Sequence, residues 1–252
     1  MTRRLVAALA CRANGTRLYG KPLQNLEPGV TILEQIVAAI RRFPIIDEIV
    51  LGISEEPENR HIIEIAKDLG VGYILGDPQD VLSRLIKCGR VGGATDVFRV
   101  TTECPFFDYS MLETAWQRHV DAESDVTVLD HVPEGLGFEI YRLATLERSH
   151  AEGQDGDRSE FCSNFARFNQ HLFKVDILKP APQNQRLDLR LTVDYPEDLV
   201  LCRRVYAALR DQAPLVALDT IVSWLDAHPE TKELVAPYVD PVPVWDGQAQ
   251  RS

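Results

Sequence analysis

The sequence alternates between short apolar runs with the spacing of strands and longer runs with the spacing of helices, and this alternation most restricts the fold. Residues 5–10 predict a buried strand. Residues 31–43 predict a helix, because apolar residues recur at helical spacing and Thr31 and Glu34 form a capping box. Repeated β-α-β units imply a mainly parallel sheet with helices on both faces. We therefore expect a three-layer α/β fold.

Further runs extend this pattern along the chain. Strands are expected at residues 48–53, 72–75, 97–100, 126–129, 138–141, 173–177 and 187–192. Helices are expected at residues 60–69, 80–87, 109–120, 143–149, 160–169, 196–210 and 218–227. We interpret residues 1–240 as one domain with a smaller lobe at about 130–180, and residues 241–252 as a flexible tail.

Charge and cysteine content limit the function classes. The net charge of −11 argues against binding to nucleic acid or anionic membranes, since affinity for phosphate backbones comes from lysine and arginine. Five cysteines without a C-x-x-C pair predict reduced thiols in a cytoplasmic protein. The six histidines have no ligand spacing, which argues against zinc. The first apolar run is too short for a signal peptide, and no later run is long enough to span a membrane.

A basic loop follows the first strand. Arg12, Arg17 and Lys21 place three cations within residues 11–21. Gly15 and Gly20 are expected to allow positive φ angles and close approach to a ligand. In parallel α/β sheets, ligands bind at the carboxyl ends of the strands, where this loop lies. The loop therefore predicts a polyphosphate site, and the alternative is an exposed loop that is basic by chance.

Two carboxylates follow later apolar runs. Glu103 comes just after the expected strand at 97–100, where a carboxylate can hold Mg²⁺ over bound phosphates. Asp194 stands at a similar position before a proline that opens a helix. The alternatives are a solvated glutamate in a turn and, for Asp194, a helix N-cap. Asp80 is a further candidate cap, with Arg84 one turn later.

Five segments, in one order along most of the chain, resemble the motifs of a known superfamily. These are the cytidylyltransferases that activate acidic sugars, the CMP-KDO and CMP-sialate synthetase superfamily, and above all its spore coat polysaccharide branch. That branch typically shows A-R-x-x-S-T-R-L-P-G-K, D-V-L-x-R, R-I-T-G-D-C-P, G-L-D-V-E-V and R-L-T-V-D-x-P-E-D. The corresponding residues here are 11–21, 80–84, 99–105, 135–140 and 190–198.

The resemblance implies a nucleotide-diphospho-sugar transferase-like fold, related to the GT-A and Rossmann folds, and transfer of CMP from CTP to a small acidic acceptor with release of pyrophosphate. Arg12, Arg17 and Lys21 would grip the triphosphate and act in catalysis. The other implied nucleotide-binding residues are Ala10, Gly15, Thr16, Asp80, Arg84 and Thr102. Glu103 and Asp194 would hold Mg²⁺, and Glu139 and Glu160 would face the acceptor. The superfamily also implies a homodimer formed through residues at about 130–180.

Several departures from the branch fall on the acceptor side. Thr102 and Glu103 replace the usual Gly-Asp pair, which moves a carboxylate by roughly one C–C bond at a metal that demands regular geometry. Gly137 replaces an aspartate, and residues 159–161 read Ser-Glu-Phe where the branch has Arg-Glu-His. Gly15 replaces a serine in the basic loop, and Tyr19 replaces a proline there. We infer an unusual acceptor.

Three other functions stay open from the sequence. The chain could be a non-catalytic nucleotide sensor or interaction module, which the departure at Glu103 favours. It could be the same enzyme class with GTP or another triphosphate, because the sequence does not fix the base. A GT-A glycosyltransferase would need a D-x-D metal motif, and the match at residues 155–157 lies in a polar loop. A dinucleotide oxidoreductase is disfavoured, since no G-x-G-x-x-G follows the first strand.

Overall fold

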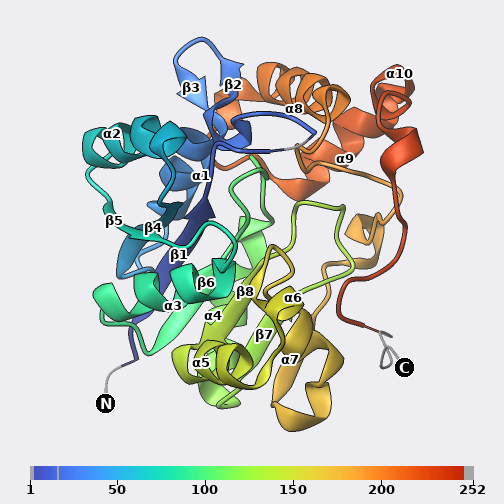
Figure 1. The fold of residues 1–252 in the computed structure, drawn as a ribbon. Coiled ribbons are helices and arrows are strands. Elements are labelled where there is room, and N and C mark those ends of the chain that lie inside the picture. The colour runs from blue at the N-terminus through green and yellow to red at the C-terminus, as the bar shows by residue number, and fades with distance from the viewer. Residues whose placement is uncertain (1–2, 16, 247–252) are drawn as a thin grey trace.

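A seven-stranded sheet forms the centre of the molecule (Figure 1). The computed structural model describes residues 3–15 and 17–246. The strands are β1 (Leu5–Cys11), β4 (Glu48–Ser54), β5 (Gly72–Gly76), β6 (Asp96–Arg99), β7 (Val126–Leu129), β8 (Glu139–Arg142) and β9 (Val175–Leu178), in the order β5-β4-β1-β6-β8-β7-β9. Strand β8 is antiparallel to β6 and β7, and the other pairs are parallel. The predicted mainly parallel α/β fold is confirmed.

Helices cover both faces of this sheet. The longer ones are α1 (Ile32–Ile40), α2 (Arg60–Asp68), α3 (Val81–Val91), α4 (Leu112–Asp121), α5 (Leu143–Glu152), α8 (Pro196–Ala208) and α9 (Leu218–Ala227). The short ones are α6 (Asp155–Arg158), α7 (Asn164–Phe168) and α10 (Pro229–Lys232). Single 3₁₀ turns lie at Lys21–Leu23, Pro57–Asn59, Tyr109–Met111, Gln170–Leu172, Pro182–Asn184, Arg210–Gln212 and Ala236–Tyr238.

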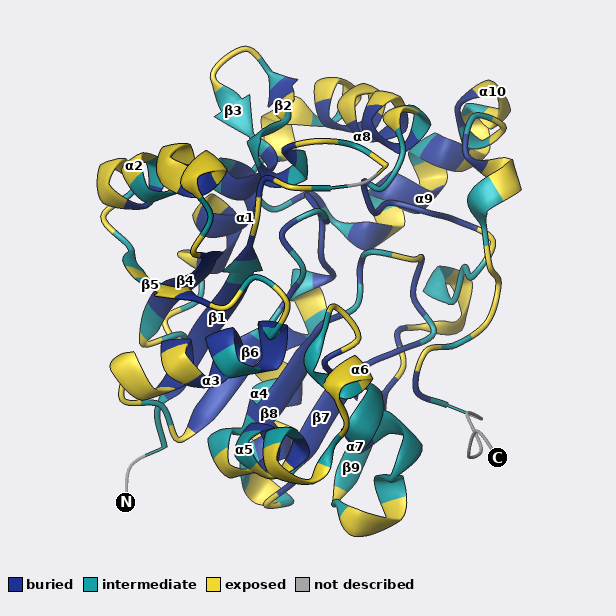
Figure 2. Ribbon diagram, viewed as in Figure 1, coloured by how far each residue is buried: buried dark blue, intermediate teal, exposed yellow. Residues whose placement is uncertain are grey.

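The alternation of side chains along β1 explains the two layers of helices. Leu5, Ala7 and Leu9 pack on one face with α1, α2, α8 and α9, whereas Val6 and Ala8 pack on the other with α3 and α5. Successive residues of a strand point to opposite faces, so a strand that is apolar throughout must be covered twice. Figure 2 shows the resulting buried strands between partly exposed helices. The structure thereby explains the unbroken apolar run of the first strand.

The helix expected at residues 31–43 forms as α1 with the predicted capping box. The backbone N–H of Glu34 donates to the Thr31 hydroxyl at 3.2 Å, and the Thr31 N–H donates to the Glu34 carboxylate at 2.7 Å. These bonds satisfy two of the N–H groups that a helix start leaves without partners. A two-stranded hairpin of β2 (Asn25–Glu27) and β3 (Val30–Thr31), which the sequence pattern does not predict, leads into this helix.

The strand expected at residues 187–192 does not form, and the prediction is wrong. This segment makes a single isolated bridge between Arg190 and Glu134, in which the Leu191 N–H donates to the Glu134 carbonyl at 2.7 Å. Leu189 and Leu191 are buried like residues of a strand, but they lie in a loop that is hydrogen-bonded to the loop at residues 132–137. The helix expected at 160–169 is also shorter, beginning at Asn164.

The end of the described chain is packed against the molecule. Trp245 is 2% exposed, and the Asp130 carboxylate accepts the backbone N–H groups of Val244, Trp245 and Asp246 at 2.8–3.0 Å. The prediction of a flexible tail from residue 241 is therefore wrong as far as Asp246, and residues 247–252 lie outside the described residues. Burial of an indole outweighs the polar, proline-bearing character of its neighbours. The predicted extent of the domain and of its lobe stays a prediction.

Within residues 3–15 and 17–246, no helix combines the length and apolar character needed to cross a membrane. In the same part of the chain, all five cysteines are buried and none forms a disulfide.

Gly135 fixes the contact between the loop at residues 132–137 and the segment 189–193. Its φ is +93°, and a Cβ there would lie 2.5 Å from the Thr192 nitrogen. Gly135→Ala should lower the free energy of unfolding by about 1–3 kcal/mol, measured by urea denaturation. Gly156→Ala is the matched control, because no atom lies within 4 Å of that Cβ; it should change stability by less than about 1 kcal/mol. Equal effects of the two changes would contradict this account.

Candidate active site

The predicted basic loop and carboxylates meet at the carboxyl edge of the sheet. Strands β1 and β6 are parallel neighbours, so the segments that follow Cys11 and Arg99 leave the sheet at the same edge. The Thr102 hydroxyl donates to the Ala10 carbonyl at 2.9 Å. The Val193 N–H donates to the Glu103 carbonyl at 3.0 Å, which brings Asp194 to this edge. Three distant parts of the sequence therefore form one site.

Asp194 is the centre of the charged groups. Its Oδ1 accepts from Lys21 Nζ at 2.5 Å and from Arg17 Nη2 at 2.8 Å, and its Oδ2 accepts from Arg190 Nη2 at 2.9 Å. Partial burial raises the pKa of Asp194, but the hydrogen bonds and charges of Lys21, Arg17 and Arg190 outweigh it and hold this pKa below its ordinary value. The carboxylate is therefore ionised at neutral pH, and it fixes two of the three predicted phosphate-binding cations.

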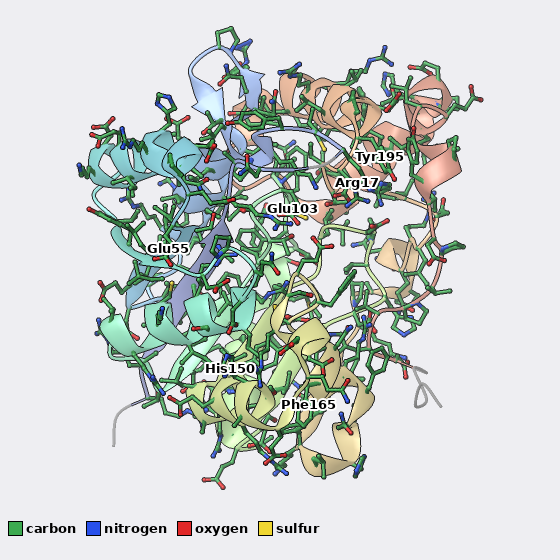
Figure 3. The ribbon with its side chains drawn as sticks, in the orientation of Figure 1. Arg17, Glu55, Glu103, His150, Phe165 and Tyr195 are labelled. Carbon is green, nitrogen blue, oxygen red and sulfur yellow. The ribbon has the colours of Figure 1, made fainter. Side chains whose placement is uncertain are left out.

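An aromatic stack supports Arg17 from the other side. The guanidinium carbon lies 5.1 Å from the centre of the Tyr195 ring, and this ring stacks on Tyr238 with centroids 4.1 Å apart. Figure 3 shows Arg17 and Tyr195 next to each other, with Glu103 close by. The Arg17 side chain is 45% exposed. Arg17 is thus positioned by stacking and by Asp194 while it stays open to an arriving anion.

Arg190, a residue not predicted to belong to the site, holds the carboxylates in place from below. It is 5% exposed and pairs with Glu134 at 2.5 Å, with Asp194 at 2.9 Å and with Asp198 at 2.9 Å. Asp198 also accepts the backbone N–H groups of Asp194 and Tyr195, each at 2.9 Å, where α8 begins. The sequence contains a signal for this contact, because Arg190 precedes Asp194 by four residues and Asp198 by eight.

Glu103 differs from Asp194 in having few partners. Burial raises the pKa of Glu103 and the charge of Asp194 raises it further, while Lys21 lowers it and does not compensate. Among the described residues, no side chain donates a hydrogen bond to its carboxylate. Glu103 and Asp194 are neighbouring carboxylates, and oxygen donors of this kind are the ligands that Mg²⁺ uses. Within residues 3–15 and 17–246, no group of three or more potential metal ligands is found.

Arg12 and Glu160, predicted for the nucleotide and the acceptor, contact each other. Arg12 Nη2 donates to Glu160 Oε2 at 3.1 Å, and both side chains are exposed. Exposed ion pairs of this kind contribute about 0–1 kcal/mol, so a stronger anion can displace Glu160. The structure therefore links the basic loop to the segment after α6.

Asp80 and Arg84, which the resemblance assigns to the nucleotide, make contacts within the protein, and their role in binding stays a prediction. Asp80 caps α3 by accepting the Ser83 N–H at 2.7 Å, and its other oxygen contacts His150 Nε2 at 2.7 Å. Arg84 is 1% exposed, and its Nη1 donates to the Cys11 carbonyl at 3.2 Å and to a second carbonyl on β4 at 2.7 Å. Arg84 thus holds the ends of β1 and β4 together, whereas Asp80 joins the start of α3 to α5.

The basic loop at residues 11–21 differs from the sequence prediction at Gly15. Gly20 has a φ of +62°, as predicted, whereas Gly15 has no positive φ and is required by close approach, since its Cβ would lie 2.4 Å from the Leu18 carbonyl oxygen. Thr16, predicted to bind nucleotide, lies outside the described residues.

Glu139, predicted to face the acceptor, lies on β8, the neighbour of the strand β6 that precedes Glu103. It begins β8, pairs in register with Arg99 of β6, and is 8% exposed. Arg99 Nη1 donates to its Oε2 at 2.6 Å, and Trp245 Nε1 donates to its Oε1 at 3.0 Å. The charge of Arg99 also acts on Glu103. The two predicted acceptor residues, Glu139 and Glu160, therefore flank one edge without touching each other.

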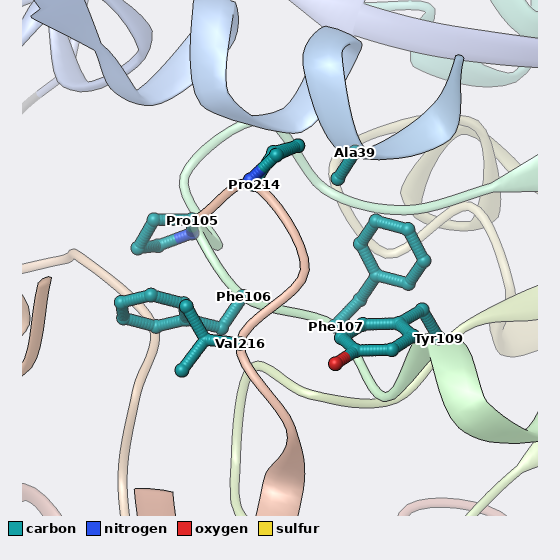
Figure 4. A pocket seen from close by; sticks show the side chains of 7 residues that line it. All are labelled: Ala39, Pro105, Phe106, Phe107, Tyr109, Pro214 and Val216. Carbon is teal, nitrogen blue, oxygen red and sulfur yellow. The ribbon is translucent and has the colours of Figure 1, made fainter. Parts of the chain in front are cut away.

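An apolar pocket near this edge is filled by side chains and has no volume that could hold a water molecule. Figure 4 shows its lining of Ala39, Pro105, Phe106, Phe107, Tyr109, Pro214 and Val216. It supports the segment after Glu103 and does not hold substrate. Cys104, which begins this segment, is buried, and burial raises the pKa of its thiol to about 12. Cys104 is therefore not a nucleophile.

Comparisons with known proteins find one curated relative by sequence and solved structures with a similar fold. No family profile matches the chain. The chain is 23% identical over 227 residues to the spore coat polysaccharide biosynthesis protein SpsF of Bacillus subtilis (strain 168), covering 88% of this chain and 94% of that protein. The structure of a cytidylyltransferase from Leptospira borgpetersenii aligns with a TM-score of 0.82 at 19% identity, covering 91% and 97%.

A second solved structure is the CMP:2-keto-3-deoxy-manno-octonic acid synthetase in complex with CTP. It aligns with a TM-score of 0.64 at 15% identity, covering 81% of this chain and 99% of the other. These similarities confirm the predicted fold and the predicted resemblance to the spore coat polysaccharide branch.

Arg190→Met should be among the most destabilising single changes at this edge. Removal of the buried cation leaves three carboxylates facing one another, for which we expect a loss of about 3–5 kcal/mol of unfolding free energy in urea denaturation. Arg118→Met is the matched control, since Arg118 pairs with Asp176 at the surface with a side chain that is 53% exposed. That change should lower stability by less than about 1 kcal/mol. Similar losses in the two variants would show that Arg190 does not support the site.

Proposed function

We propose that this chain is a cytidylyltransferase that transfers CMP from CTP to an acidic sugar, a nonulosonic or 2-keto-3-deoxy acid, or to a related small metabolite. The observation that carries the proposal is the group formed by Asp194, Lys21, Arg17 and Glu103 at the carboxyl ends of β1 and β6. The positioned cations of Lys21 and Arg17 suit a triphosphate, and the neighbouring Glu103 carboxylate suits a divalent cation. The similarity to cytidylyltransferases supports the choice of nucleotide.

The chemistry proposed is a single displacement. A hydroxyl oxygen of the acceptor attacks the α-phosphorus of CTP and forms a new P–O bond. The bond between the α-phosphorus and the oxygen that bridges it to the β-phosphate breaks, its electron pair leaves on pyrophosphate, and the hydroxyl proton is released to solvent. Lys21 and Arg17 donate to the phosphate oxygens on which negative charge increases. Arg12 exchanges its exposed partner Glu160 for a phosphate. Because Asp194 and Tyr195 already position the first two cations, little reorganisation is needed.

A magnesium ion fits the donor set, and Glu103 and Asp194 are the residues proposed to hold it. Mg²⁺ commonly binds through one or two carboxylates together with substrate phosphates, and the Glu103 and Asp194 carboxylates lie close enough to act on each other's charge. When bound, the ion would supply charge neutralisation between phosphate oxygens. In its absence, Asp194 is held by Lys21, Arg17 and Arg190.

The acceptor is proposed to bind between Glu139 and Glu160, beside the phosphate site. The altered residues at 137 and 159–161 fall in this part of the chain, which favours an acceptor that differs from those of the related enzymes. We further propose a cytoplasmic homodimer with contacts from residues at about 130–180. Light scattering tests the dimer, and a strictly monomeric mass would contradict it.

Thermal shift assays with each of the four ribonucleoside triphosphates, with and without Mg²⁺, test the nucleotide. We expect selective, Mg²⁺-dependent stabilisation by CTP, since a ligand at about 100 times its Kd adds about 2.7 kcal/mol of stability. Selective stabilisation by GTP would keep the enzyme class and change its product. The absence of any shift would contradict a triphosphate site and favour an interaction module.

Glu103→Gln is the informative variant in the same assay. Folding raises the pKa of Glu103, mainly because the side chain is buried. The contribution of this group to the stability of the folded state is therefore complete below its unfolded pKa and is lost as the pH rises through its folded pKa. The neutral variant should therefore melt at a higher temperature than the wild type at pH 7 without metal. It should also lose the Mg²⁺ dependence of the CTP shift, and retention of that dependence would place the metal elsewhere.

Lys21→Ala and Arg17→Ala should each reduce turnover at least about 100-fold in a pyrophosphate-release assay with the fold intact, because each removes a donor to the developing charge. Lys67→Ala serves as a control for charge loss, since Lys67 lies on α2 and pairs with Glu64 at the surface. Near-normal rates in the first two variants would mean that the basic loop is not the phosphate site.

A further inference from the structure

The segment 244–246 is fastened to the acceptor side by contacts of several kinds. The Asp130 carboxylate accepts its three backbone N–H groups at 2.8–3.0 Å, and Gln170 Nε2 donates to the Trp245 carbonyl at 2.9 Å. A chain end that packed by chance would not satisfy its backbone groups so fully. This segment is therefore a built part of the structure.

Charged groups secure the far end of the same segment. The Asp246 carboxylate contacts His131 Nε2 at 2.9 Å and Lys179 Nζ at 2.5 Å. His131 follows β7 and Lys179 follows β9, so the segment spans the carboxyl ends of the two neighbouring strands. It lies at the edge of the sheet at which the proposed reaction occurs.

The indole of Trp245 connects this segment to Glu139. Its ring packs beside Tyr141 with centroids 6.4 Å apart, and Nε1 donates to Glu139 Oε1 at 3.0 Å. Arg99 donates to the other oxygen at 2.6 Å. Both carboxylate oxygens therefore have a fixed donor, which sets the plane of the carboxylate. Each oxygen keeps a further lone pair, so Glu139 can still accept a hydrogen bond from a ligand.

We infer that residues 244–246 form a wall of the acceptor site and that Trp245 is the positioning residue that orients Glu139. This inference rests on the proposed function and deepens it. The remaining lone pairs of the Glu139 carboxylate accept from O–H and N–H groups, so this wall recognises the hydroxyl or amide groups of the acceptor. The acid group of the acceptor then lies toward the cations of the basic loop.

The alternative is that Trp245 only fills space beneath β8. The two roles predict different effects when the indole N–H of Trp245 is removed. A space-filling residue affects overall stability and all ligands together, whereas a positioning residue affects the acceptor and leaves the nucleotide unchanged.

Trp245→Phe removes the N–H and keeps an aromatic ring beside Tyr141. With CTP, Mg²⁺ and either N-acetylneuraminic acid or 2-keto-3-deoxy-manno-octonic acid, we expect the KM for the acid to rise about tenfold, as for loss of one hydrogen bond to a charged group. The Kd for CTP should not change. Trp224→Phe on α9 is the matched control and should alter neither constant. Equal changes in the acceptor KM and the CTP Kd would overturn the inference.

An NMR measurement decides the inference without turnover. The sequence has three tryptophans, so the ¹⁵N spectrum holds three indole N–H signals, and Trp245→Phe identifies one by its loss. Glu139→Gln should move that signal and leave the other two in place. An unmoved Trp245 signal would show that this residue does not hold Glu139. If the wild type released pyrophosphate with neither acid, the proposed function would be in doubt, and this spectrum would still test Trp245.

Discussion

The Asp194 carboxylate binds Lys21, Arg17 and Arg190, and the geometry of the whole site depends on this interaction. Cations at a site for phosphate repel one another, and an internal anion lets them converge before any ligand arrives. Preorganised donors of this kind need no rearrangement when charge develops in the transition state. Asp194 therefore joins the basic loop to the segment before α8, although these lie far apart in the sequence.

The rest of the structure holds that carboxylate where it is needed. Arg190 balances the charge of Asp194, Asp198 and Glu134 inside the protein, and the positive φ of Gly135 allows the loop that carries Glu134 to reach the segment 189–193. A buried cation surrounded by carboxylates does not by itself favour stability, because desolvation opposes the attraction. The network instead fixes the position of the Asp194 carboxylate, which orients Lys21 and Arg17.

Local chemistry predicts much of this fold and part of the site. The alternating runs, the capping box of α1 and the convergence of the basic loop with Glu103 follow from periodicity and from the geometry of parallel sheets, whereas Asp194 reaches the same edge through a contact between loops. Strand-like alternation misleads at 187–192, because burial by loops produces the same pattern as burial in a sheet. The role of Arg84 depends on depth, which spacing does not reveal, and the packing of Trp245 depends on residues more than a hundred positions away.

The central claim is that Arg17, Lys21, Glu103 and Asp194 form one site for a triphosphate and its metal. A crystal structure of the protein with CTP and Mg²⁺ tests it most directly. We expect phosphate oxygens within hydrogen-bonding distance of Lys21 and Arg17, with the metal ion bound to Glu103 and Asp194. A triphosphate bound at another edge of the sheet, away from Lys21 and Arg17, would contradict the account.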